Sequence, residues 1–205
     1  GLSMRLEGGL EAFCGIVTAE PPPAAPSLTL AAIRLLDAAC AGSDNNVKVA
    51  HKRGVPAAAL AFLRTNIASS VTCEAAAALL ASLAPTERTA RALSDADASG
   101  VRGGATTLVV AVLRRHVEDA DVVSASLRLL LALAGDSDTA AQLCAAGAHA
   151  ALAGLPGLTV ACEADLCLAT GQLRRALACA AALAQGCGDR LHLSASRRFA
   201  RRMSP

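Results

Sequence analysis

Four glycines recur along the chain at similar intervals, and this spacing is the feature that most constrains the fold. They are Gly9, Gly54, Gly104 and Gly147, separated by 45, 50 and 43 residues. Each precedes an apolar stretch with leucines, valines or alanines at helical spacing. A period in the forties that contains several helices indicates an α-solenoid, in which each unit buries its apolar faces only against its neighbours.

The clearest unit lies between Val122 and Leu155. Its first helix is expected to carry an apolar stripe that faces other helices, formed by Leu127, Leu130, Leu131 and Leu133. Asp136 or Ser137 is then expected to cap a short helix by accepting a bond from a free amide. Gly147 ends the short helix, and we expect it to adopt a positive φ, which glycine does without steric cost.

The same order of elements appears earlier in the chain. Residues 35–63 contain a leucine-rich helix, a cap at Ser43 or Asp44, a short helix, Gly54 and another apolar helix. Residues 79–93 begin a further copy. The sequence therefore predicts an all-α protein with three helices in each unit, and Gly54 is also expected to have a positive φ.

These residues resemble armadillo repeats. The family's turn into its second helix is similar to Gly54-Val55-Pro56 followed by Leu60 and Leu63, and to Gly147-Ala148-His149 followed by Leu152. The end of its third helix is similar to residues 79–84 and 130–134. The resemblance covers most of the chain and implies a right-handed superhelix. HEAT repeats are the nearest alternative, but a two-helix unit leaves the short helix before each glycine unexplained.

The resemblance also implies a division of the chain. We expect residues 1–205 to form a single solenoid that begins with a partial repeat at 1–42, which contains a proline-rich insertion at 20–27. Three repeats follow, at 43–84, at 85–135 with a loop at 94–104, and at 136–187. Residues 188–205 form a basic tail or the start of a further repeat. Beyond residue 155 two registers remain open. The third helix of that unit lies at 160–173, which we prefer, or at 173–185.

Successive third helices of such an array form a groove that binds a peptide or a protein domain. Armadillo proteins that carry nuclear-localisation peptides place a Trp and, four residues later, an Asn on each third helix. The matching pairs here are Leu35/Ala39, Ala78/Ser82, Arg128/Ala132, and either Leu168/Gln172 or Ala178/Ala182. The stacked indoles that hold lysine side chains are thus missing, which disfavours a nuclear transport adaptor.

Small side chains with scattered polar groups occupy the expected groove instead. The candidate partner-binding residues are Glu74, Ser82, Ser124, Arg128, Gln172 and Arg174. We therefore expect a non-catalytic scaffold for protein–protein interactions, a subunit or fragment of a larger assembly. The chain begins with Gly1, and neither end carries an obvious polar cap, so we also expect more chain, a second copy or a partner to cover at least one end.

Positive charge is concentrated near the C-terminus. Residues 190–205 carry +5 and the rest of the chain −3. The tail residues Arg197, Arg198, Arg201 and Arg202 indicate either a segment that binds nucleic acid or an acidic partner, or the solvent face of a further helix. A nucleic-acid-binding solenoid is accordingly the alternative function, with basic helix faces that include Lys48, Lys52, Arg53, Arg64, Arg114 and Arg115. The net acidic body and the lack of Trp and Tyr weigh against it.

No pattern in the sequence favours catalysis, a metal or a cofactor. The four histidines fall in different repeats without a known catalytic motif, and none of the eight cysteines forms a CxxC pair. We expect no catalytic residue, no metal ligand and no small-molecule substrate. We interpret the cysteines as small buried apolar residues, with Cys73 and Cys144 reduced and slow to alkylate. This favours a reducing compartment, the cytoplasm, with a nuclear or a cytoskeletal or ciliary assembly as alternatives.

Membrane insertion is not expected either. The longest uncharged run, residues 139–162, is interrupted by glycines and a proline and is only mildly apolar.

Overall fold

A computed structural model describes residues 8–20, 26–95 and 104–155, and all structural statements below concern these residues. They form helices only, without a strand, so the prediction of an all-α protein is confirmed for this part of the chain. In chain order the helices are α1 (Gly9–Val17), α2 (Pro26–Cys40), α3 (Asp44–Lys52), α4 (Val55–Thr65), α5 (Ser70–Ser82), α6 (Glu87–Asp95), α7 (Gly104–Arg115), α8 (Ala120–Leu133), α9 (Ser137–Ala145) and α10 (Ala148–Ala153).

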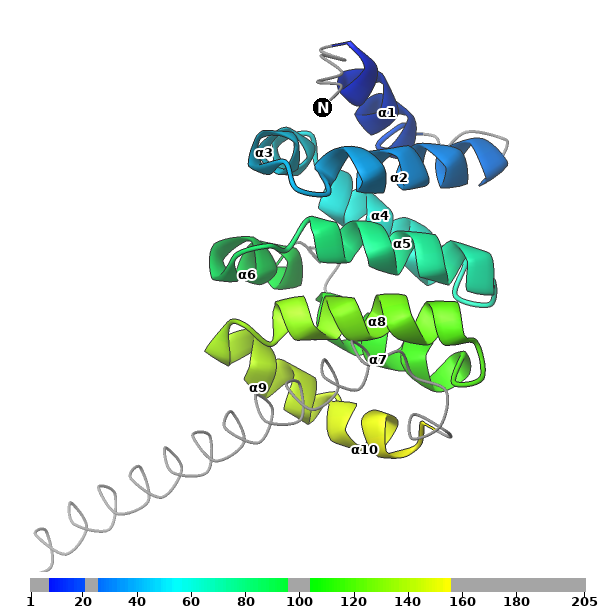
Figure 1. Cartoon of the computed structure of the whole chain (residues 1–205), viewed down its shortest axis with the longest axis vertical. Coiled ribbons are helices and arrows are strands. Elements are labelled where there is room, and N and C mark those ends of the chain that lie inside the picture. The colour runs from blue at the N-terminus through cyan, green and yellow to red at the C-terminus, as the bar shows by residue number, and fades with distance from the viewer. Residues whose placement is uncertain (1–7, 21–25, 96–103, 156–205) are drawn as a thin grey trace, which may run out of the picture.

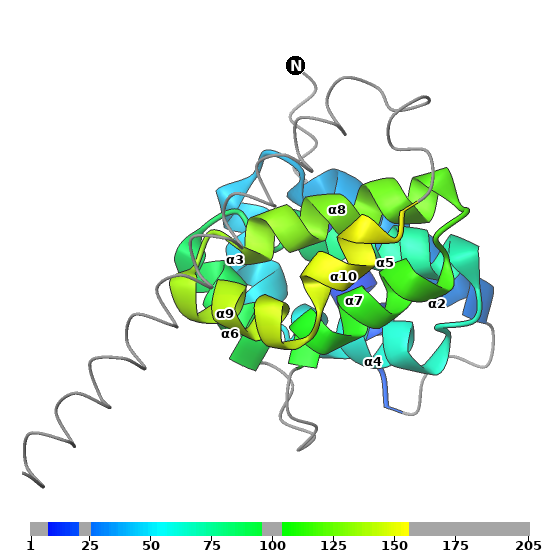
Figure 2. The same ribbon diagram turned by 90° about the horizontal axis from the view of Figure 1, so that it is seen from below.

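The helices are arranged in rows. Three long helices, α2, α5 and α8, lie side by side, and the middle one, α5, packs extensively against both of the others (Figure 1). Helices α4 and α7 lie behind them, as the view from below shows (Figure 2). The short helices α3, α6 and α9 sit at one end of the rows (Figure 1). A three-helix order of short, intermediate and long is thus present in α3–α5 and again in α6–α8.

Two of the four marker glycines have the predicted conformation. Gly54 (φ 76°) and Gly147 (φ 81°) are left-handed and precede α4 and α10 directly, so the prediction is confirmed at both positions. Gly104 has a φ of 32° and begins α7. Gly9 is different. It is the first residue of α1 and has no positive φ, so it does not play the part in the repeat pattern that Gly54 and Gly147 play, and its inclusion among the repeat markers was wrong.

Polar side chains at several helix starts fix where those helices begin. Ser69 accepts a bond from the Thr72 amide ahead of α5, and Asp119 accepts one from Val122 ahead of α8. Asp136 accepts a 3.0 Å bond from the Thr139 amide, which settles the choice between Asp136 and Ser137 as the cap of α9. Ser43 occupies the cap position of α3 but makes no such bond.

The core lies between the rows and is made of leucine and alanine. Leu79 and Leu80 of α5, and Leu129 and Leu130 of α8, are fully buried. Adjacent alanines such as Ala76 let neighbouring helices approach closely. The expected burial of Leu130 is therefore confirmed, whereas Leu131, placed on the same stripe by the sequence, is only half-buried.

Helices extend into both of the loops that were predicted at 20–27 and 94–104. Helix α2 already begins at Pro26, so Pro26 and Ser27 are helical, and proline suits a first helical position because its missing N–H would have no partner there. Helix α6 continues to Asp95, and α7 begins at Gly104. Among the helices that the structure describes, none combines the length and apolar character needed to cross a membrane.

Candidate docking face

The long helices α2, α5 and α8 lie side by side, and we call the set of their solvent-accessible residues named below the α2/α5/α8 face. Its residues recur every three or four positions, because one side of a helix repeats with that spacing. All are exposed or half-buried: Leu28, Ala31 and Leu35 on α2, Val71, Glu74, Ala78 and Ser82 on α5, and Asp121, Ser124 and Arg128 on α8.

Two of the predicted groove residues connect α5 to α2. Glu74 pairs with Arg34 at 3.1 Å, and the Ser82 hydroxyl donates to Asp37 at 2.6 Å. The partners are 40 and 45 residues apart, so each contact joins two long helices that are distant in the sequence. Arg34 is 56% exposed, and such a surface pair contributes only about 0.2–1 kcal/mol. Its main effect is to orient the two side chains.

The other predicted groove residues lie on α8 or beyond the described part of the chain. Ser124 is half-buried and Arg128 is exposed, both on the helix that packs beside α5. Gln172 and Arg174 lie outside the described residues, as do the tail residues Arg197, Arg198, Arg201 and Arg202. The structure therefore brings four of the six candidates onto two neighbouring helices.

An open hollow of about 120 Å³ lies where the three long helices meet at this face. Its lining residues are Arg34, Ser70, Val71, Glu74, Asp119 and Asp121. Three carboxylates therefore surround one guanidinium, and the hollow carries net negative charge. Ligand pockets usually measure about 300–1,000 Å³, so a hollow this small suits one side chain of a partner rather than a small-molecule substrate.

Exposed apolar side chains also gather on this face. Within the described residues, the large apolar side chains that are exposed are Leu28 (48%), Leu35 (49%) and Val71 (50%). Two lie on α2 and the third lines the hollow from α5. Leu35 was expected on the groove from the repeat register, but Leu28 and Val71 were not singled out, because leucines and valines at helical spacing indicate burial unless the direction of each helix face is known.

One cysteine lies near a histidine in space, which raises the question of a catalytic pair. Cys73 Sγ is 3.7 Å from His116 Nε2, but that nitrogen also lies 2.8 Å from the Ile67 carbonyl, to which it must donate. Nε2 of His116 therefore carries a hydrogen and cannot accept the thiol proton. Burial raises the pKa of the Cys73 thiol to about 11, opposite to what an activated nucleophile requires. The geometry is that of a packed structural thiol.

The cysteines differ in burial. Of the four cysteines that the structure describes, Cys14, Cys40 and Cys73 are buried and Cys144 is half-buried, and none of these four forms a disulfide. Burial raises the pKa of the Cys144 thiol as well. No group of three or more potential metal ligands is assembled within the part of the chain that the structure describes.

The basic residues of the alternative function are distributed over several helices. Lys48 and Lys52 are exposed on α3, and Arg53 follows that helix and pairs with Glu11 at 2.6 Å. Arg64 lies on α4. Arg114 and Arg115 end α7, and Arg114 donates to the Gly147 carbonyl at 3.1 Å. The lysines belong to the row of short helices, whereas Arg64, Arg114 and Arg115 belong to the row of α4 and α7. Arg53 and Arg114 each connect segments that are distant in the sequence.

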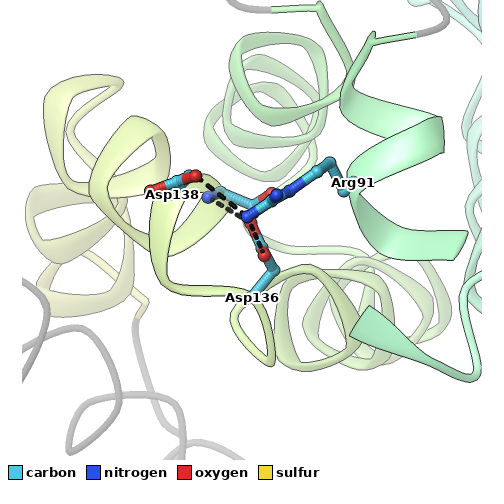
Figure 3. Close-up of polar contacts among 4 residues, drawn as sticks. Arg91, Asp136 and Asp138 are labelled. Carbon is cyan, nitrogen blue, oxygen red and sulfur yellow. Dashed lines mark hydrogen bonds and ion pairs between the residues drawn. The ribbon is translucent and has the colours of Figure 1, made fainter. Parts of the chain in front are cut away.

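A buried carboxylate provides a further contact between units, on the end of the molecule formed by the short helices. Arg91 of α6 donates to Asp136 at 2.7 Å and to Asp138 at 2.9 Å (Figure 3). Asp136 also accepts bonds from the amide and the hydroxyl of Thr139. The cap of α9 is therefore held by the unit before it.

Comparison with known proteins adds no family. No protein-family model matches the chain, and no curated protein matches it.

Proposed function

We propose that the chain is an armadillo-like, right-handed α-solenoid that acts as a scaffold and binds another protein through the α2/α5/α8 face. Three features support the architecture. Left-handed glycines precede α4 and α10, long helices recur as every third element, and these long helices pack side by side. Contacts between units join residues about one repeat apart, such as Ser82 with Asp37 and Arg91 with Asp136.

The observation that carries the proposed function is the position of the exposed apolar side chains. Leu28, Leu35 and Val71 each expose about half of their surface, and all three lie on two adjacent long helices. Apolar groups gathered on one face lose contact with water when a partner covers them, which is the main driving force for protein association. The charged hollow beside Val71 adds the polar contacts that determine specificity.

A scaffold role requires no catalytic residue, metal or cofactor, and we propose that the partner is one or more subunits of a larger assembly. Among the described cysteines three are buried and none forms a disulfide, which suits a reducing compartment, and we propose the cytoplasm on that ground.

Paired arginine substitutions test the proposal. Leu35→Arg with Val71→Arg puts charge on the proposed face at two half-exposed positions, where folding should be little affected. Ala57→Arg with Ala61→Arg puts the same charge on exposed positions of α4, in the row behind. The tagged full chain is expressed in its native cells, and its sedimentation in the lysate is compared for both variants.

The proposal predicts that the wild-type chain and the α4 variant sediment as a large complex and that the face variant sediments near its own mass. Circular dichroism establishes that both variants are folded. Equal sedimentation of the two folded variants would show that the α2/α5/α8 face is not the docking surface.

A further inference from the structure

The hollow on the α2/α5/α8 face has the chemistry to bind an arginine side chain. Asp121 is exposed beside it, and Asp119 and Glu74 line it from α8 and α5. The charge of Arg34 is offset by its pair with Glu74 at 3.1 Å, so the two aspartates determine the local charge. A guanidinium can bind carboxylates through two parallel hydrogen bonds, which makes arginine the natural occupant of such a hollow.

The environment of the hollow also specifies what lies next to that arginine. Val71 lines it and is 50% exposed, so an apolar side chain of the occupant can pack there. The occupant should therefore combine clustered arginines with at least one large apolar residue.

Resting on the proposed function, we propose that this occupant is the chain's own segment 197–202, bound within the same molecule. Residues 197–202 contain four arginines and Phe199, which match the two requirements of the hollow. The charges also match at the scale of the whole chain, because residues 190–205 carry +5 and the remainder −3.

The chain is long enough for this contact. Between Leu155, the last described residue, and Arg197 there are 41 residues, which span about 60 Å even at the 1.5 Å per residue of a continuous helix. Helix α8 has 14 residues and is about 21 Å long by the same rule, and the hollow lies at its N-terminal end. The contact depends on charge and weakens with salt, and it covers Val71 while it lasts.

A photo-crosslinker at position 71 tests the proposal in the purified full-length chain. A benzophenone amino acid replaces Val71, the crosslinked chain is digested, and the crosslinked peptides are identified by mass spectrometry. At 50 mM salt we expect the main product to join position 71 to residues 190–205 of the same molecule. We expect its yield to fall about fivefold at 500 mM salt and in the variant with Arg197, Arg198, Arg201 and Arg202 all changed to Gln.

Matched variants separate this contact from chance proximity. Changing the same four arginines to Lys keeps the charge but removes the paired hydrogen bonds, so the yield should lie between those of the wild type and the Gln variant. Asp121→Asn should also reduce the yield. The crosslinker at Ala57 of α4, on the row behind, should not reach residues 190–205. The proposal is overturned if position 71 gives no product with this segment, if position 57 gives an equal yield, if the product joins two chains, or if the Gln variant reacts like the wild type.

The result is independent of the sedimentation experiment. If the Leu35→Arg and Val71→Arg variant loses its complex but no internal crosslink forms, the docking function stands and this inference fails. If the internal crosslink forms but the face variant keeps its complex, the inference stands and the docking function fails.

Discussion

Several described helices begin with a side chain that accepts a bond from a backbone amide. Among these capping residues, Asp136 should be the one whose replacement by alanine destabilises the protein most. Asp136 is 7% exposed and accepts bonds from the Thr139 amide (3.0 Å), the Thr139 hydroxyl (2.9 Å) and Arg91 (2.7 Å). One carboxylate thus begins α9 and connects it to α6 of the preceding unit (Figure 3).

The magnitude follows from these contacts. Loss of an aspartate cap costs about 1 kcal/mol, and up to about 2 kcal/mol in proteins. Because Arg91 is 54% exposed, its pair with Asp136 adds only about 0.2–1 kcal/mol after screening by solvent. The total is about 2 kcal/mol, which for a chain of this size lowers Tm by roughly 4–8 °C.

Asp119→Ala is the matched control. Asp119 caps α8 in the same way, through a longer bond of 3.3 Å to Val122, and should cost about 1 kcal/mol. Asp138 also pairs with Arg91 but is 74% exposed, so Asp138→Ala should cost at most about 0.5 kcal/mol. Chemical denaturation of all three variants gives the comparison. The reasoning is refuted if Asp138→Ala is as destabilising as Asp136→Ala.

The pH dependence of stability gives a second test of the contact between Asp136 and Arg91. Burial alone would raise the pKa of Asp136, but the bonds from Thr139 and Arg91 outweigh it and hold the pKa below its ordinary value of 3.8. A carboxyl with a depressed folded-state pKa stabilises the fold fully above the unfolded value and loses that contribution as pH falls through the folded value. The stability gap between the wild type and Asp136→Asn should therefore be constant from pH 7 to about 5 and shrink below about pH 4. A constant gap down to pH 2 would contradict this.

Three other changes have clear expected outcomes. Gly54→Ala should lower the free energy of unfolding by about 1 kcal/mol, because alanine is strained in the left-handed conformation. Gly147→Ala should lower it by about 2 kcal/mol, because a Cβ there would lie 2.5 Å from the Arg114 guanidinium and break its bond to the Gly147 carbonyl. A larger loss for Gly54→Ala than for Gly147→Ala in chemical denaturation would exclude this contact. Ser126→Ala should raise stability by about 1 kcal/mol, since the buried Ser126 hydroxyl has no hydrogen-bond partner, and a lower Tm would show that a partner exists. Leu130→Ala should cost about 2–5 kcal/mol, and a loss under 1 kcal/mol would mean that the interface between units is loose.

The helices and their turns could be predicted because the signals are local. Gly54 and Gly147 needed only their position between two helical stretches, and Asp136 needed only its place before one. The prediction for Gly9 was wrong because it also relied only on neighbouring residues. A glycine at a helix start suits either a left-handed turn or an ordinary first position, and its neighbours do not distinguish the two.

The docking face could be predicted only in part, because it depends on which side of each helix the neighbouring helices cover. Glu74 and Arg128 were placed on the face through the repeat register. Leu131 was expected in the core and is half-buried, and the exposed Val71 was not singled out. Their helical spacing is the same as that of core residues, so only the packing of α5 and α8 reveals the difference.

Contacts between units were also beyond local reasoning, although the repeat length offered a signal. Arg34 and Glu74 are 40 residues apart, and Arg91 and Asp136 are 45 apart. A search for opposite charges one period apart would have found both pairs.

Hydroxyl-radical footprinting of the chain, alone and in the complex isolated from its native cells, tests the docking face most directly. Leu28 and Leu35 of α2 are exposed and lie outside the hollow, and we expect their oxidation rates to fall several-fold in the complex. Phe62, half-buried on α4 in the row behind, should keep its rate. Unchanged rates at Leu28 and Leu35, together with protection of Phe62, would contradict the proposal that partners bind the α2/α5/α8 face.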